Sequence, residues 1–261
     1  MNERECLQLG IGSRTDVGRV RSDNEDTCRV LPSLSLFIIS DGMGGESHGE
    51  LASAIAGDTI ARYCSENPDD TSTPNGEVRR PDLSEKTNRL ASAVRLANRR
   101  IYETALENPL LHGMGATVVA AWLEGLRLSL VHVGDSRAYL FRSGILRHLT
   151  SDHTLVAEQI KRGLIKPEDA HLSKMQNVLI RALGVEQQVE LDATECMLID
   201  HDVLLLCTDG LTRMVPDPEI ASTLTQSSEP QISADNLVLL ANQHGGEDNV
   251  SVIVLHIAGV S

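Results

Sequence analysis

Short runs of β-branched and leucine residues recur along the chain and restrict its fold more than any other feature. Glu124-Gly125 joins two of these runs, and so short a link predicts a tight antiparallel hairpin. Helical patterns do not alternate regularly with the runs, which favours an α+β fold with an antiparallel core. The predicted strands cover 34–40, 117–123, 126–133, 137–141, 203–208 and 250–256.

Three helices are predicted around these strands. Ser47 and Glu50 form a capping box, so one helix should begin there. A second is predicted over about 83–107 from one apolar stripe at helical spacing, and a third over about 230–243 before the last strand. The stripe consists of Leu90, Val94, Ala97, Ile101 and Ala105.

The chain is interpreted as a single domain, 1–261, with two segments outside its core. Residues 67–81 hold three prolines, one glycine and little apolar material, which predicts a surface loop. Residues 153–183 are polar and basic with weak core patterning, which predicts a mobile flap between two strand-rich portions.

Composition and charge argue against several classes of protein. A net charge of −14 and only 2% aromatic residues oppose nucleic-acid binding, which needs basic surfaces and stacking rings. The longest apolar run has about six residues and the first ten residues lack the apolar core of a signal peptide. We therefore expect a cytoplasmic protein that binds neither nucleic acid nor membrane.

Acidic residues stand at strand ends in five places: four flank the strands given above, and Glu25-Asp26 precedes a further short predicted strand. In three of the five places the acid is next to the glycine of a Gly-Asp or Asp-Gly pair. A single Asp-Gly is more often a simple turn. Five such acids meeting in one cleft would repel one another unless cations neutralised them. Because carboxylate oxygens select hard cations, the pattern predicts a site for two or three Mg²⁺ or Mn²⁺ ions that activate water against a phosphate. The five positions are Glu25-Asp26, Asp41-Gly42, Gly134-Asp135, Asp209-Gly210 and Glu247-Asp248.

Arg21 lies four residues before Glu25. Its planar guanidinium can grip two phosphate oxygens at once, so it is the predicted phosphate ligand. The plainer interpretation is an ordinary surface arginine.

Six motifs, in order along the chain, carry a resemblance to a known family. The chain resembles the metal-dependent protein phosphatases (PPM, or protein phosphatase type 2C) in their short bacterial form, from about residue 9 to 257. The resemblance implies two central antiparallel sheets flanked by pairs of helices, with the flap near the cleft. The motifs are RSDNED (21–26), SDGMGG (40–45), GAT (115–117), VGDSRAYL (133–140), TDGL (208–211) and GEDNVSVI (246–253).

The resemblance also implies an activity: a serine/threonine protein phosphatase in which a metal-bridging water attacks phosphoserine or phosphothreonine directly. Its partners would be phosphorylated proteins, opposite a serine/threonine kinase, and the phosphatase would be a monomer. Asp41 would bridge the two core ions and Gly42 would offer its carbonyl. Asp209 and Asp248 would bind the first ion.

The remaining site residues follow from the same resemblance. Glu25 or Asp26 would hold the second ion through water, and Arg21 would grip the substrate phosphate. Asp135 would help Asp209 to hold a third, weaker ion.

Two positions depart from the family's best-known patterns. Met43 stands where eukaryotic members carry a histidine suggested as the general acid, which leaves the identity of that acid open. Arg213 stands where many members place an aspartate of the third metal site, which puts binding of a third ion in doubt.

Two other functions fit parts of the sequence. The segment from Cys207 to Arg213 matches C-x-x-G-x-x-R, the loop of phosphatases that use a thiolate nucleophile, although Asp209 would oppose an anion there. A family-like domain that binds phosphoproteins without turnover is the second alternative, and the presence of every core acid opposes it.

Overall fold

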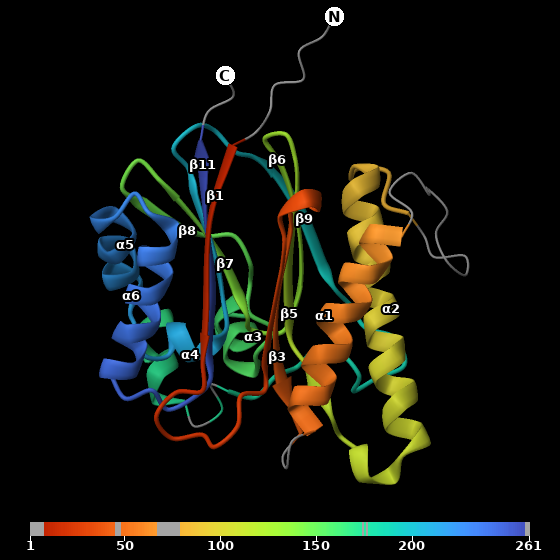
Figure 1. The fold of residues 1–261 in the computed structure, drawn as a ribbon. Coiled ribbons are helices and arrows are strands. Elements are labelled where there is room, and N and C mark those ends of the chain that lie inside the picture. The colour runs from red at the N-terminus through yellow and green to blue at the C-terminus, as the bar shows by residue number, and fades with distance from the viewer. Residues whose placement is uncertain (1–7, 45–47, 67–78, 174, 176, 259–261) are drawn as a thin grey trace, which may run out of the picture.

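Two antiparallel β-sheets lie face to face between two layers of helices in the computed structural model (Figure 1), which describes residues 8–44, 48–66, 79–173, 175 and 177–258. Every strand pairing within the two sheets is antiparallel. The predicted α+β class with two antiparallel sheets is therefore confirmed.

In the first sheet the order of the strands in space differs from their order along the chain, whereas in the second it follows the chain. The first sheet runs β1 (Gln8–Asp16), β11 (Val250–Ala258), β10 (Val203–Cys207), β7 (Arg137–Arg142) and β8 (Ile145–His148). The second runs β2 (Asp26–Leu31), β3 (Leu36–Met43), β5 (Val118–Glu124), β6 (Arg127–Val133) and β9 (Asp192–Met197), with β4 (Gly115–Ala116) paired to β3.

The two outer layers are helix pairs, on opposite sides of the sandwich in Figure 1. The second sheet is covered by α1 (His48–Glu66) and α2 (Glu85–Glu107), and the first by α5 (Asp217–Gln226) and α6 (Pro230–Gln243). Shorter helices are α3 (Leu155–Lys161) and α4 (Asp209–Thr212), with 3₁₀ turns at Pro32–Leu34, Pro109–Leu111 and Pro167–Leu172.

The side chains of β3 point alternately into two different apolar layers, which explains why the sequences of the central strands are continuous apolar runs. Leu36 and Ile38 point to the layer under α1 and α2, whereas Phe37 and Ile39 point into the layer between the sheets. Successive side chains of a strand point to opposite faces, so a strand covered on both faces must be apolar throughout. A third apolar layer separates the first sheet from α5 and α6.

The predicted α2 stripe and the predicted hairpin are confirmed, the hairpin with its link shifted by one residue. The stripe on α2 is buried along its length, and Ser84 caps this helix by accepting a hydrogen bond from the Thr87 N–H. The hairpin between β5 and β6 is present, but Glu124 pairs with Arg127, so the linking residues are Gly125 and Leu126. Ser47 of the predicted capping box lies outside the described residues, as does 67–78 of the predicted loop.

Three strands of four residues or more and the helix α5 were not predicted; the strands are β1, β8 and β9. The short elements β4, α3 and α4 were not predicted individually either. Most residues of β1, β8 and β9 are partly or fully exposed, so their sequences lack the apolar run on which the strand predictions depended. Within the described part of the chain, none of the helices combines the length and the apolar composition that a membrane crossing needs.

Candidate active site

Seven of the eight predicted site residues line one cavity of about 670 Å³. The cavity lies where β6 ends and β11 begins. This is the end of the sandwich opposite the N and C labels of Figure 1. Residues between 177 and 190 form its other wall. The seven are Arg21, Glu25, Asp41, Gly42, Asp135, Asp209 and Asp248.

Asp41 is held rigidly by backbone pairing. β3 continues to Met43, so Asp41 lies inside the strand and pairs with Asp26 of β2. Thr117 fixes both polar groups of its backbone: the Asp41 carbonyl accepts from the Thr117 N–H at 2.8 Å, and the Asp41 N–H donates to the Thr117 hydroxyl at 3.2 Å. Close packing requires glycine at position 42, because a Cβ on Gly42 would collide with the Gly49 carbonyl of α1.

Asn249 fastens the loop that carries Arg21 and Glu25 to the start of β11. Its side-chain amide donates to the carbonyls of Val17 at 3.0 Å and Asp23 at 2.9 Å, and its carbonyl oxygen accepts from the Glu25 N–H at 2.8 Å. The asparagine thereby places the loop against the neighbouring Asp248.

Crowding of acids under partial burial makes their ionised forms costly. Burial, reinforced by Asp26 and Asp209, holds the pKa of Asp41 well above its ordinary value. Burial likewise raises the pKa of Asp26 to about 7 and that of Asp135 to about 7. The pKa of Asp209 is also raised, chiefly by burial, although Arg213 opposes the shift.

The donor atoms fit a hard divalent cation. The acids that line the cavity offer only oxygen, which suits Mg²⁺ and Mn²⁺. Asp26 lies behind the cavity wall, where its Oδ2 accepts from the Thr208 hydroxyl at 3.0 Å while its buried Oδ1 has no partner. An unpaired buried carboxylate oxygen is rare and calls for a cation or a bound water.

Two arginines neutralise the outer acids. Arg21 reaches Asp248 through a hydrogen bond from Nη2 to Oδ2 at 2.9 Å and an ion-pair contact of Nε with Oδ1, also at 2.9 Å. Arg213 faces the cavity, with Nη1 3.3 Å from Asp248 Oδ2 and 3.5 Å from Asp209 Oδ2. Arg213 therefore places its charge between two predicted metal ligands.

Comparisons with known proteins agree with the motifs and the fold. The sequence profile of the family described as protein phosphatase 2C matches residues 13–239. The chain belongs to this family. It is 38% identical over 245 residues to the serine/threonine phosphatase stp of Listeria monocytogenes, covering 93% of each chain. It is 39% identical over 252 residues to the serine/threonine protein phosphatase PstP of Mycobacterium tuberculosis, covering 96% of this chain and 45% of that longer protein.

Solved structures of the protein phosphatase 2C family superpose closely on the chain. The crystal structure of the M. tuberculosis phosphatase PstP/Ppp matches with a TM-score of 0.86 and 36% identity, covering 97% of this chain and all of that one. The catalytic domain of PstP in complex with two manganese ions matches with a TM-score of 0.82 and 37% identity over the same shares.

Cys207 lies in a setting that opposes the thiolate alternative to this family's chemistry. It is fully buried at the end of β10, and burial raises the pKa of its thiol to about 12. A reactive cysteine needs a lowered pKa and an accessible sulfur. Arg213, which would cradle the phosphate in the thiolate loop, contacts Asp209 and Asp248 instead.

Several residues that shape the site of this phosphatase family were not singled out from the sequence. Arg181 was noted only as one of the basic residues of 153–183, yet it lines the cavity. Thr117 and Asn249 lie inside motifs, but their roles depend on contacts across 76 and 224 residues of sequence. The motif positions were the one signal that could have drawn attention to them.

Asp26→Asn should stabilise the protein in chelator, and increasingly so as pH rises. An aspartate whose pKa is raised from 3.8 to about 7 on folding gives its full stabilisation below pH 4 and loses it as pH rises toward 7. The asparagine does not titrate, so the difference in unfolding free energy should grow by roughly 1.4 kcal/mol per pH unit across that window. Urea unfolding at pH 5 and pH 8 measures it, and an equal difference at both would contradict the expectation.

Proposed function

We propose that the chain is a metal-dependent serine/threonine protein phosphatase that hydrolyses phosphoserine and phosphothreonine in proteins. The observation that carries the proposal is the convergence of Asp41, Asp135, Asp209 and Asp248 on one cavity beside Arg21. Membership of the family and the manganese complex of PstP support it.

Each acid is assigned a role in holding Mg²⁺ or Mn²⁺. Asp41, with the Gly42 carbonyl, would help to hold two core ions, and Asp209 and Asp248 would hold the first of them. Glu25 is the better candidate for the second ion, since it lines the cavity whereas Asp26 lies behind the wall. A pair of such ions supplies an activated water and a positive surface for the phosphate.

The chain's own groups then bind and orient the substrate. Arg21 is half-exposed, with its fork on Asp248, and can turn that fork to two phosphate oxygens. Thr117 and Asn249 hold Asp41 and the Arg21 loop so that the acids and the arginine keep their spacing. Met43 also lines the cavity, and its thioether has no proton to give to a leaving alkoxide.

The wider proposals are one phosphatase domain over 1–261, a monomer, location in the cytoplasm and substrates phosphorylated by a serine/threonine kinase. The residues between 177 and 190 that wall the cavity belong in part to the proposed flap, 153–183, which supports a role of that segment near the substrate. Light scattering at several protein concentrations tests the monomer.

A phosphopeptide assay tests the activity. The protein, dialysed against EDTA, should release no phosphate from a phosphothreonine peptide, and addition of Mn²⁺ or Mg²⁺ should restore turnover because the activated water depends on the ions. A phosphotyrosine peptide of the same sequence serves as the substrate control. Full turnover in excess chelator would refute the metal-dependent mechanism.

The assay also distinguishes the alternative of a binding protein without turnover. That protein would bind the phosphothreonine peptide in the presence of Mn²⁺ but release no phosphate. The acids of the cavity oppose this alternative, because binding alone does not require so many carboxylates around an anion.

A further inference from the structure

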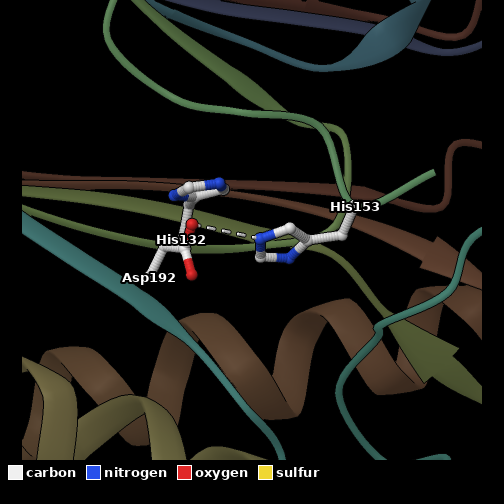
Figure 2. A group of neighbouring side chains, drawn as sticks. All are labelled: His132, His153 and Asp192. Carbon is white, nitrogen blue, oxygen red and sulfur yellow. Dashed lines mark ion pairs between the residues drawn. The ribbon is translucent and has the colours of Figure 1, made fainter. Parts of the chain in front are cut away.

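A second group of metal-ligand type lies beside the cavity and was not predicted from the sequence. His132, His153 and Asp192 each offer a ligand atom within 4.8 Å of the others (Figure 2). The two imidazole rings stack with their centroids 4.7 Å apart, and both histidines are buried. Two histidines and a carboxylate form a donor set that suits zinc.

The hydrogen bonds of His153 argue against a metal ion there. Its Nδ1 accepts from the Gly134 N–H at 3.1 Å, and a backbone N–H is always a donor. Nδ1 therefore carries the lone pair, and Nε2 carries the proton, facing Asp192 at 3.5 Å. A metal ion on Nε2 would move the proton to Nδ1, where it would point at the N–H of Gly134.

Arg181 also occupies the space that an ion would need. Its Nη1 donates to Asp192 Oδ1 at 3.3 Å, and its Nη2 pairs with Glu190 at 2.9 Å. Nη1 also lies 3.3 Å from Nε2 of His153, a contact between two N–H groups that both face Asp192 and not a hydrogen bond. A guanidinium already supplies the positive charge beside the Asp192 carboxylate. Burial, moreover, lowers the pKa of His153 to about 4, so the ring is neutral at pH 7.

His153 instead holds the turn that presents Asp135 to the cavity. Besides the bond to Nδ1, the Gly134 carbonyl accepts from the His153 backbone N–H at 2.9 Å. Gly134 has a φ of +100°, and a Cβ there would lie 2.6 Å from the Thr117 side chain, so the turn requires glycine at this position. The Ser136 hydroxyl, bonded to that of Thr117 at 2.6 Å, holds the far side of the turn. The two bonds with His153 fix the direction in which the chain leaves β6.

The same residue anchors the opposite wall. The His153 carbonyl accepts from the Ile180 N–H at 2.8 Å, next to Arg181, and both Ile180 and Arg181 line the cavity. One buried residue thus connects the Gly134–Asp135 turn with the wall formed by 177–190.

We propose that His153 is a positioning residue: through Nδ1 it orients the Gly134–Asp135 turn and thereby sets the affinity of the Asp135 carboxylate for a divalent cation. The inference depends on the proposed function, in which Asp135 contributes to a third and weaker ion. It adds a residue that touches neither metal nor substrate.

The test compares two variants of nearly equal shape. His153→Asn keeps an acceptor oxygen near the place of Nδ1, whereas His153→Leu fills the same volume without one, and both lose Nε2. Mn²⁺ binding is followed by electron paramagnetic resonance of the free ion, and phosphatase activity is titrated with Mn²⁺. Outer partners of a metal ligand typically change affinity about 10- to 100-fold, so His153→Leu should weaken the last-bound ion by that factor. His153→Asn should stay near wild type.

Controls separate positioning from general destabilisation. His132→Leu removes the stacked ring, which has no bond to Gly134, so it should lower the melting temperature without moving the Mn²⁺ titration. An unchanged titration in His153→Leu, an equal shift in His132→Leu, or no recovery in His153→Asn would each overturn the inference.

A zinc measurement tests the metal-site alternative directly. Zn²⁺ added to the Mn²⁺-loaded protein should be taken up equally by wild type and by Asp192→Asn. One further equivalent held by wild type alone would show that the histidine pair binds metal, which contradicts the proton arrangement argued above. A wild type that is inactive with Mn²⁺ would instead count against the proposed function. The effect of the His153 variants on Mn²⁺ binding would still test the positioning role of His153.

Discussion

Asp209→Asn should abolish phosphatase turnover, whereas Cys207→Ser should leave turnover per folded molecule close to wild type. Asp209 begins α4, with only Thr208 between it and the end of β10, and lines the cavity, so the substitution removes a carboxylate from the proposed first ion. Loss of an outer partner already costs about 10- to 100-fold in affinity or activity, and loss of a direct ligand should cost more. Metal affinity and kcat should therefore fall together.

Cys207→Ser is the matched substitution two residues away. Cys207 packs in the layer between the first sheet and its helices, where a serine hydroxyl would need a hydrogen-bond partner. The change should lower stability by about 1–3 kcal/mol. Both variants are assayed at saturating Mn²⁺, with rates normalised to the folded fraction from circular dichroism.

The exposed acid Asp235 on α6 provides a control for charge removal alone. It pairs with Arg14 at 3.6 Å and does not line the cavity, so Asp235→Asn should retain wild-type turnover. An inactive Cys207→Ser together with an active Asp209→Asn would overturn the metal mechanism in favour of the thiolate one.

The sequence sufficed where one strand carried both an apolar run and a motif. β3, β6, β10 and β11 are covered on both faces by apolar layers, and their runs were recognised without any pairing information. β9 was missed because none of its residues is fully buried and its sequence carries no apolar run. Its pairing with β6 decides its structure. Tertiary pairing overrides weak local preference at such edge strands.

The acids of the site were predictable because each belongs to a motif near the end of a strand, although Asp41 lies inside β3 and not after it as predicted. The orientation of the two arginines was not predictable. Nothing in the sequence indicates that Arg21 and Arg213 both converge on Asp248, since the three residues belong to separate parts of the chain. His153 was missed for the same reason: its contact with Gly134 spans 19 residues and has no local pattern.

Arg21→Ala should lower kcat/KM about 10- to 100-fold without weakening metal binding. Loss of a charge-assisted contact worth roughly 1.5–3 kcal/mol to the phosphate accounts for that range. The bonds of Arg21 to Asp248 add a second expectation. Since the guanidinium competes with cations for that carboxylate, its removal should leave the Mn²⁺ concentration for half-maximal activity unchanged or lower.

Two further arginine variants make this result specific. Arg21→Lys keeps the charge but loses the fork, so it should recover only part of kcat/KM if two phosphate oxygens are gripped at once. Arg29→Ala removes an arginine of β2 that pairs with Asp58 at 2.7 Å and does not line the cavity, and it should behave as wild type. If Arg21→Ala matches Arg29→Ala in kcat/KM, Arg21 serves only to neutralise Asp248, and phosphate binding must be assigned to another residue of the cavity.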